Sequence, residues 1–418
     1  MHAKKEYDVI IVGGGIAGLY SAYKIRHMAP HLSILLLEGN NKKYMGGRIS
    51  NDTFYGTVIN NGAGIGNRKR DTHLMKLLHD LNIKCHDFPV TSQYAKTLHP
   101  LIDIKRIYLH LKDVFKSAPE KYKGYTMKEF TTKTIGVPLY KKFVTCSGYA
   151  DYTDMDCRDF FENYGFEHTY ETWTGVKVPW KRLVDTLCKK IGEDCIKASS
   201  KVVSIDENKH SGWFHVETKQ GQSYACRQII LATTITSALQ LIPGAKQHDS
   251  LYRQIHPRAF LRMYGKFDKT SAFLMKQLVP TTTIVPGPIH KILPVDKEKG
   301  IYQIAYTDSE GAQFFHRKNR LENTEQTREF WCQMLETSLG LERSTLQLEG
   351  IRSYYWTVGE HYYEPLREPF KTRREFLSQA QHPMKNMLVV GEMVCTYPGW
   401  TEGALESVEA VLHKSWLL

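Results

Sequence analysis

The chain has 418 residues, of which 42% are hydrophobic, and its formal charge is +12. This length allows two domains and this apolar content allows a sizeable core, so the sequence excludes a disordered chain. It has no apolar run long enough to span a membrane. Short basic clusters occur at Lys42–Lys43, Arg68–Lys69–Arg70 and Arg373–Arg374. No nucleic-acid-binding motif accompanies them, which indicates a solvated surface.

The eight cysteines indicate free thiols. They are scattered along the chain, and no two have the CxxC spacing typical of zinc sites. The polar start, "MHAKKEYD", does not have the pattern of a secretory signal. We therefore expect reduced thiols, no metal site and a cytoplasmic location.

The first elements form a strand–helix–strand unit. Asp8–Val12 is short, β-branched and followed by glycine, which predicts a buried strand. Ile16–Ala29 has the apolar spacing of a helix, and Pro30 ends it. Ser33–Glu38 is a second buried strand. The two strands are expected to run parallel.

The remaining elements follow less regular patterns. In chain order we predict a helix over Thr72–Leu81, helices mixed with aromatic loops over 90–185, three strands over Val202–Thr233, strands near Phe260–Phe267 and Ile301–Tyr306, a helix over Glu325–Leu339, a buried strand in "NMLVVGE" and a helix over Thr401–Lys414.

Glycines 13, 15 and 18 fit the G-x-G-x-x-G pattern between the first strand and the first helix. In a dinucleotide-binding turn the first glycine allows the tight turn. The second admits a pyrophosphate to the main chain, and the third lets helix and strand pack closely. The amino end of the helix then supplies free N–H groups and a partial positive charge. The pattern with its flanking elements predicts a dinucleotide site.

Glu38 ends the second strand, twenty residues after Gly18, where a carboxylate accepts hydrogen bonds from a ribose. Periodicity leaves NAD and FAD open as the dinucleotide. The sequence "GGRI" at Gly46–Ile49 favours a second contact with the dinucleotide phosphates.

At this point the chain resembles the flavin-containing amine oxidase family, which includes monoamine, polyamine and L-amino-acid oxidases. The resemblance rests on four blocks: "VIIVGGGIAGLYSAYKI", "LLLEGNNKKYMGGRI", "VVSID…IILAT" and "LVVGEMVCTYPGWTEGALESVEAVL". It implies an α/β fold with a Rossmann-like FAD domain of residues 1–70, 190–250 and 375–418. Residues 71–189 and 251–374 would form a mixed α+β substrate domain.

The resemblance also implies a set of FAD contacts and a noncovalent cofactor, since neither His361 nor Cys395 has the context of a covalently attached flavin. The matching positions are Gly13, Gly15, Gly18, Glu38, Gly46, Gly47, Arg48, Gly62, Ala63, Val202, Glu392, Thr401 and Glu402. A helix beginning at Thr401 and directed at the flavin would stabilise negative charge on the reduced ring, by roughly 1 kcal/mol or more.

The implied reaction passes a hydride from the carbon beside an amine to flavin N5. The imine hydrolyses to a carbonyl compound, and oxygen is reduced to hydrogen peroxide. By resemblance, Trp400 and Tyr362 orient the amine, with Trp356 and Tyr363 as substitutes. A lysine near flavin N5 would be Lys266.

Two positions depart from the family pattern, and the sequence does not decide which residue serves at each. Arg262 lies as near the expected lysine position as Lys266 does, and an arginine there would put oxygen reactivity in doubt. Amino-acid oxidases bind the substrate carboxylate with arginine. Ile65 stands where some relatives have that arginine, so Arg68 or Arg70 would have to serve.

Three kinds of protein remain as alternatives. The first is an oxidase of mono- or polyamines or of L-amino acids, with oxygen as acceptor and a homodimer as one assembly to be expected. The second is a desaturase or porphyrinogen-type oxidase, for which the chain shows no membrane-docking apolar segment. The third is a flavin-binding or scaffold protein without turnover.

Overall fold

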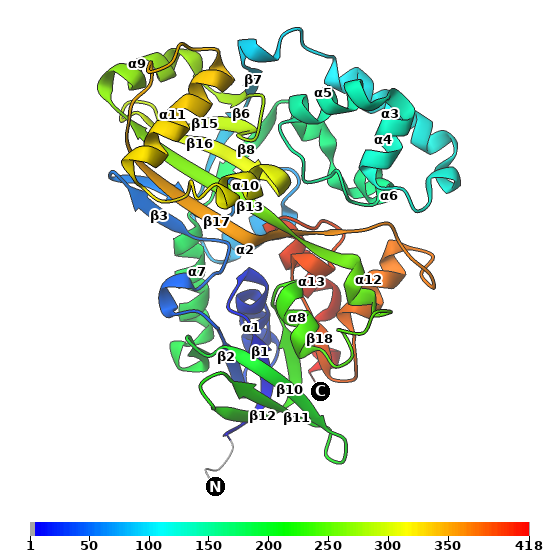
Figure 1. The fold of residues 1–418 in the computed structure, drawn as a ribbon. Helices are drawn as coiled ribbons and strands as arrows, with labels where there is room; N and C mark the ends of the chain where they lie inside the picture. The colour runs from blue at the N-terminus through cyan, green and yellow to red at the C-terminus, as the bar shows by residue number, and fades with distance from the viewer. Residues whose placement is uncertain (1–4, 418) are drawn as a thin grey trace.

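A seven-stranded sheet forms the core of the first lobe, at the bottom of Figure 1. The computed structural model describes residues 5–417. The strands follow the order β10–β11–β12–β1–β2–β9, and β18 also pairs with β12. Their bounds are β1 Lys5–Val12, β2 Ile34–Leu37, β9 Ile196–Lys197, β10 Val202–Asn208, β11 Trp213–Thr218, β12 Ser223–Leu231 and β18 Met387–Val389. Because β1 runs parallel to β2 and β12, the carboxyl ends of these strands share one edge.

Helices cover both faces of this sheet, which explains the continuous apolar runs of its central strands. Val9 and Ile11 belong to the core cluster of one face, and Ile10 and Val12 to that of the other. The first cluster includes α1 (Ile16–Met28), α2 (Thr72–Asp80), α7 (Trp180–Ile191) and α13 (Thr401–Val411); the second includes α8 (Ile235–Leu241) and α12 (Arg373–Gln381).

A six-stranded, mostly antiparallel sheet organises the second lobe, with the order β17–β13–β16–β15–β14–β7. The strands are β7 Ser92–Tyr94, β13 Ile255–Phe267, β14 Thr282–Ile284, β15 Lys291–Asp296, β16 Ile301–Asp308 and β17 Leu348–Tyr363. One face, with Leu261 and Met263, packs against α9 (Lys269–Leu278), α10 (Ser309–Arg317) and α11 (Glu325–Leu339). The other face carries polar side chains such as Arg262 and Gln303.

A helical subdomain completes the second lobe at the upper right of Figure 1. It contains α3 (Ile104–Ser117), α4 (Met127–Ile135), α5 (Val137–Ser147) and α6 (Cys157–Asp159), which continues into a π-helical turn over Phe160–Tyr164. Buried aromatic rings dominate its core.

Two small sheets lie at the junction. The hairpin of β3 (Asn51–Phe54) and β4 (Thr57–Asn60) packs against Tyr264 of the second lobe. The other small sheet joins β5 (Gly66–Asn67), β8 (Trp173–Lys177) and β6 (His86–Val90). Together they hold the segment 61–71 beside both lobes.

The predicted fold class is confirmed, and the helix over Glu325–Leu339 has the predicted bounds. The three strands expected within Val202–Thr233 are β10, β11 and β12. The predicted domain boundaries give α2 and α7 to the substrate domain, whereas both helices contribute to the core of the first lobe. All eight cysteines are free thiols. Within residues 5–417, every helix is too short or too polar to cross a membrane.

Arg373 ties the first lobe to the helical subdomain. Its Nε lies 2.8 Å from Asp159, and its Nη2 lies 3.5 Å from Asp156 and donates to the Glu364 carbonyl at 2.9 Å. Burial raises the pKa of Asp159 to about 7, while Arg373 acts to lower it. Although the sequence placed Arg373 in a solvated basic cluster, it is the cation of a buried ionic group. Its neighbour Arg374 is exposed.

We predict that Arg373→Met lowers the free energy of unfolding by about 3–5 kcal/mol, because it leaves two neighbouring buried carboxyl groups without a cation. Arg374→Met is the matched control and should change it by less than about 0.5 kcal/mol. Urea unfolding of both variants measures the difference, and equal effects would contradict the assignment.

Candidate active site

The glycine turn after β1 is formed by close main-chain contacts. Gly13 has a φ of +112°, and a Cβ there would overlap the Ala232 carbonyl at the end of β12. A Cβ on Gly18 would overlap the Gly13 carbonyl. A Cβ on Gly15 would meet no atom within 4 Å. The first and third glycines therefore allow the turn and the helix to pack, while the second leaves open space at the helix amino end.

That amino end has no side-chain cap, because Gly15 is the residue before the helix. Its N–H groups are thus available to an anion. Glu38 lies beside the turn and accepts hydrogen bonds from the Gly14 N–H at 2.7 Å and from Asn40. A carboxylate offers about four lone-pair sites, so Glu38 can still accept a bond from a ribose hydroxyl.

The second glycine pair touches the first turn directly. The Gly46 N–H donates to the Gly14 carbonyl at 2.8 Å, and Gly47 lies against Gly15 with a φ of +61°. Arg48 follows and pairs with Glu392 at 2.6 Å. Segments 13–18, 46–48 and 391–392, far apart in sequence, therefore meet at the carboxyl edge of the first sheet.

Glu392 is a buried anion with several donors. Its oxygens accept from Arg48, from the His361 ring and from the Gly399 N–H at 2.8 Å. Burial acts to raise the pKa of Glu392, but His361 and Arg48 outweigh it and hold that pKa well below its usual range. The Ile235 N–H donates to His361 Nε2, so Nδ1 carries the hydrogen toward Glu392.

The other residues of the expected FAD contacts lie as follows. Gly62 and Ala63 form a turn held by the Ala63 N–H on the Arg48 carbonyl at 2.8 Å. Val202 begins β10. Thr401 begins α13, whose amino end also lacks a side-chain cap. The carboxylate of Glu402 instead accepts from the Thr72 hydroxyl, from the main-chain N–H and ring Nδ1 of His73 and from the Leu74 N–H, at the first turn of α2.

These residues fit a dinucleotide. The open space at Gly15, the uncapped amino end of α1 and the carboxylate of Glu38 lie at one edge of the sheet. Arg48 keeps its Nε and Nη2 free of partners in the described chain, so it can meet a phosphate. The first lobe would hold the adenine dinucleotide along this edge.

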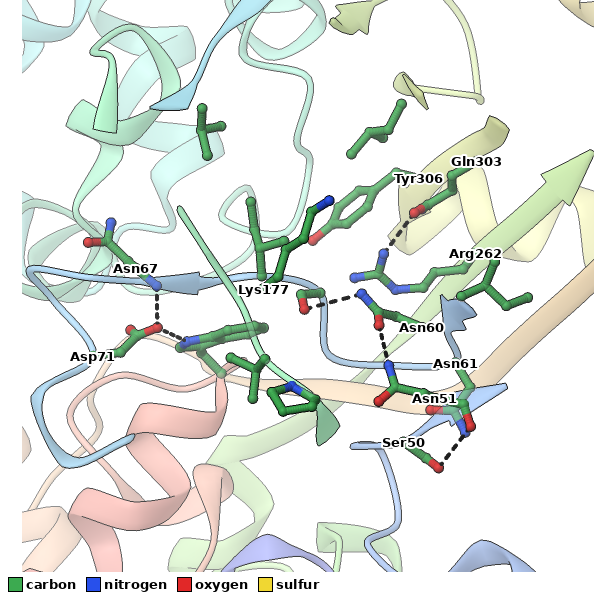
Figure 2. Close-up of a pocket in the computed structure, with 18 of the residues that line it drawn as sticks. Ser50, Asn51, Asn60, Asn61, Asn67, Asp71, Lys177, Arg262, Gln303 and Tyr306 are labelled. Atoms are coloured by element: carbon green, nitrogen blue, oxygen red, sulfur yellow. Dashed lines mark hydrogen bonds between the residues drawn. The ribbon is translucent and has the colours of Figure 1, made fainter. Parts of the chain in front are cut away.

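A cavity of about 2650 Å³ lies between the lobes and the helical subdomain. Its walls come from the hairpin β3–β4, the segment 61–71, the polar face of the second sheet, the helical subdomain and the start of α13. Figure 2 shows Asp71 on one side, with Arg262, Gln303 and Tyr306 across from it. Gly64 and Trp400 line the cavity and adjoin the dinucleotide contacts.

Aromatic side chains line this cavity. Trp400 donates its indole N–H to Asp71 at 3.0 Å and meets Trp180 edge to face. Trp356 donates to the Asn61 carbonyl at 2.8 Å. Tyr397 is a further wall residue. Trp400 and Trp356, which the sequence predicted, and Tyr397, which it did not, therefore all line the cavity.

Tyr362 and Tyr363 lie elsewhere, which is a correction to the expected substrate site. The Tyr362 ring stacks on His256 and under Arg258, and it packs against the core of the helical subdomain. Tyr363 is 1% exposed, and its hydroxyl bonds the Met393 and Cys395 carbonyls. Neither ring lines the cavity.

Of the two basic residues considered on β13, Arg262 lines the cavity and Lys266 does not. The Arg262 Nε donates to the Gly62 carbonyl, and its Nη1 donates to Gln303 at 2.8 Å. Lys266 donates to the Phe267 carbonyl and pairs with Glu349 at 2.9 Å. The residue beside the Gly62–Gly64 turn is therefore the arginine.

Of the two arginines considered for a carboxylate, Arg70 lines the cavity and Arg68 does not. Arg68 pairs with Asp87 at the surface. Arg70 donates to the Gly165 and Tyr164 carbonyls, at 3.2 and 3.3 Å, and its guanidinium lies 5.0 Å from the Tyr397 ring centre.

Lys291 is a buried amine in the cavity wall, only 7% exposed. Its Nζ lies 2.9 Å from the Tyr149 ring centre and 5.6 Å from that of Tyr306. Among residues 5–417 no carboxylate lies within 4.0 Å of it, although Asp151 and Asp308 act from further away. Burial lowers the pKa of Lys291 to about 7.

Two acidic residues of the cavity wall, Asp151 and Glu360, also have raised pKa values. Burial, then the neighbouring Asp308, raises the pKa of Asp151 to about 6, and Asp151 accepts from the Tyr164 hydroxyl at 2.6 Å. Burial, then Asp151, raises the pKa of Glu360 well above its usual range. On the other side of the cavity, burial raises the pKa of Asp71 to about 6.

Sequence reasoning missed Tyr149, Lys291 and Tyr306, because they lie in segments without recognisable motifs. A β-bulge adds a further obstacle. Arg262 pairs with Tyr306 and Tyr264 with Gln303, so one extra residue on β16 lets both Gln303 and Tyr306 face the cavity. Strict alternation would have placed them on opposite faces.

Comparison with known families agrees with this geometry. The profile of flavin-containing amine oxidoreductases matches residues 135–410, and that of NAD(P)-binding Rossmann-like domains matches residues 11–81. The first match covers more than half of the chain, so the protein belongs to the flavin-containing amine oxidoreductase family. It is a flavin-dependent amine oxidoreductase, as the sequence predicted.

Solved structures share the fold along the whole chain. A cofactor-redesign variant of putrescine oxidase has a TM-score of 0.76 at 13% identity, with 99% of each chain covered. Cyclohexylamine oxidase from Brevibacterium oxydans has a TM-score of 0.74 at 16% identity, with 98% of each chain covered. An uncharacterised protein of Acanthamoeba polyphaga mimivirus is 41% identical over 49 residues, which is 12% of this chain and 9% of that protein.

We predict that Gly15→Ala leaves the fold intact but weakens flavin binding about tenfold or more. The φ of Gly15 is −73°, which alanine adopts freely, and its Cβ would meet only open space. That space is where a phosphate would approach the main chain, and losing one charge-assisted hydrogen bond has an effect of this size. Thermal melting and flavin absorbance after gel filtration measure the two properties. In Gly18→Ala the added Cβ would overlap the Gly13 carbonyl, so this variant should lose both thermal stability and flavin binding.

We predict that Lys291→Met stabilises the protein. At about pH 8 the folded protein holds a neutral amine there, while the unfolded chain holds a charged one, a difference on the order of 3 kcal/mol against folding. The gain should shrink as pH rises toward 10.5, the ordinary lysine value. The groups around position 291 are unchanged between the wild type and Lys291→Met. They are Asp151, Asp308, Tyr149, Tyr306 and Arg262. Denaturant unfolding across pH measures the gain, with exposed Lys116→Met as control; a loss of stability would refute it.

Proposed function

We propose that the protein is an FAD-dependent oxidase of a primary or secondary amine, with FAD bound noncovalently and oxygen reduced to hydrogen peroxide. The observation that carries this proposal is the turn at Gly62–Gly64. Its main chain bonds the Arg48 carbonyl on the dinucleotide side, Trp180 in the core of the first lobe and Arg262 on the cavity side. A flavin bound along the first lobe would thus end at the wall of the aromatic cavity.

When bound, the flavin would supply the redox chemistry by accepting a hydride from the carbon beside the amine. The protein contributes position and electrostatics. Glu38 would accept a hydrogen bond from the ribose, and the amino end of α1 would donate to the diphosphate. The uncapped amino end of α13 begins beside Trp400, at the cavity, and stabilises negative charge there.

The cavity favours the neutral form of the amine, which is the form that reacts. Arg262 is a permanent cation, 3% exposed, beside the Gly62–Gly64 turn. A positive charge so close raises the free energy of an ammonium ion. Trp400 and Trp356, each fixed by an indole hydrogen bond, limit the orientations of the substrate.

The surroundings of His361 and Cys395 support a noncovalent flavin. His361 is 2% exposed and both ring nitrogens are bonded, to Glu392 and to the Ile235 N–H. Cys395 is also 2% exposed, and its thiol donates to the Glu392 carbonyl at 3.1 Å. Burial raises the pKa of that thiol well above its usual range, which disfavours the nucleophilic thiolate.

Peroxide release across a panel of amines tests the proposal. We predict oxygen-dependent peroxide with at least one amine, and for Trp400→Ala a turnover about a hundredfold lower with the flavin retained, because the substrate loses a positioning wall. Trp213→Ala, on strand β11 away from the cavity, is the matched control and should keep the rate. A yellow protein whose flavin is not bleached by any amine under argon would favour the binding-protein alternative instead.

A further inference from the structure

The cationic side chains inside the cavity have no anionic partners. Arg70, Arg262 and Lys291 all line it, and in the part of the chain that the structure describes none of them forms an ion pair within 4.0 Å. Buried cations usually pair with an acid, because an unpaired charge away from water costs free energy. The guanidinium groups of Arg70 and Arg262 therefore remain available to a ligand, and so does the Lys291 amine, which an anion beside it would bring into its protonated form.

Lys291 is the least satisfied of the three. Arg262 donates to a carbonyl and an amide oxygen, and Arg70 donates to two carbonyls. Within residues 5–417 the Lys291 Nζ makes no hydrogen bond to an oxygen and contacts only the faces of two tyrosine rings. All three of its donors can therefore turn to a ligand oxygen.

The acidic residues of the cavity are poorly suited to neutralise these cations. Asp71 already accepts from the Asn67 N–H and the Trp400 indole, and Glu402 accepts from the first turn of α2. Asp151 accepts from a tyrosine hydroxyl, and Glu360 is held toward its neutral form by burial. Glu360 also lies 3.7 Å from Arg258, and the ionised Asp308 acts on Lys291 only from beyond 4.0 Å. These acids thus have other partners or lie too far away to form an ion pair with Arg70, Arg262 or Lys291, which leaves those side chains to a negative group of a ligand.

The mouth of the cavity also carries mainly positive charge. Exposed basic residues on its rim, without an ion pair among residues 5–417, are Lys43, Lys84, Lys177, Arg182, Lys189 and Lys190. Of the acidic rim residues, Asp52 and Asp185 are paired with Arg352 and Lys181, whereas Glu171 has no ion pair among residues 5–417. The unpaired charges of the rim are therefore predominantly positive. A cleft lined by one sign of charge raises the local concentration of ligands of the opposite sign. This accounts for part of the +12 charge.

We propose that the substrate is an amine that also carries an anionic group, a carboxylate or a phosphate, and that Lys291 binds that group. This rests on the proposed amine oxidase function and names its substrate class. The Tyr306 ring lies within 4.8 Å of the Arg262 guanidinium and 5.6 Å of the Lys291 ammonium, so it separates the two cations along the wall. The anionic group lies at Lys291, beyond this ring, and the amine lies toward Arg262 and the Gly62–Gly64 turn.

A matched panel tests this. Alkylamines of one chain length would end in a methyl, an amino, a carboxylate or a phosphate ester group, and kcat/KM is measured for each. We expect the anionic amines to be preferred. Lys291→Met should lower kcat/KM about ten- to a hundredfold for the anionic members only, as expected for one charged hydrogen bond. Lys291→Arg, which keeps the charge, should retain the preference, and salt should weaken it.

The outcomes separate this proposal from the previous one. If all amines are oxidised equally, or the diamine best, the anion site is wrong and the oxidase function stands. If no amine is oxidised, the oxidase function fails. The anion site is then decided by thermal shift of the holoprotein with butyrate or inorganic phosphate, which should stabilise the wild type and not Lys291→Met. Equal shifts in both proteins would overturn the site.

Discussion

The close contact between two glycine turns is the constraint on which the rest of the structure depends. The Gly46 N–H bonds the Gly14 carbonyl, and Gly18 packs on the Gly13 carbonyl, so no side chain fits at Gly13 or Gly18. This brings β1, α1 and the chain after β2 to one place. From Gly46 the chain continues through Arg48 to the Gly62–Gly64 turn, whose main chain contacts the second lobe. The position of the glycine turn after β1 therefore determines where the cavity lies.

Arg262 is the residue of the second lobe that contacts this part of the first lobe. It lies on the long strand β13, whose side chains point alternately to the helices of its own lobe and to the cavity. Its Nε donates a hydrogen bond to the Gly62 carbonyl of the first lobe. An uncharged residue there would not favour the neutral amine that the proposed function needs. A lysine would bring a charge that can titrate. The arginine therefore combines a structural contact between the lobes with a permanent positive charge in the cavity wall.

The dinucleotide side could be predicted from sequence because it depends on local patterns. Gly13, Gly15 and Gly18 follow one strand and begin one helix, and Glu38 ends the next strand, so their neighbours in space are set by a single βαβ unit. The cavity could not be predicted in the same way. Tyr149, Lys291 and Tyr306 come from a helical loop and two strands, and they meet only through tertiary packing. A bulge on β16 also reverses the alternation that would locate its inward residues.

The basic charge illustrates the same limit. Counting lysines and arginines gives the sign of the net charge but not the location of the charges. The short basic clusters in the sequence have different structural roles. Arg68 pairs at the surface, Arg70 lines the cavity and Arg373 is buried between acids. Lys291, which belongs to no cluster, has the strongest physical case for function. A buried amine without an ion pair disfavours folding, and residues that disfavour folding are retained chiefly where a site needs them.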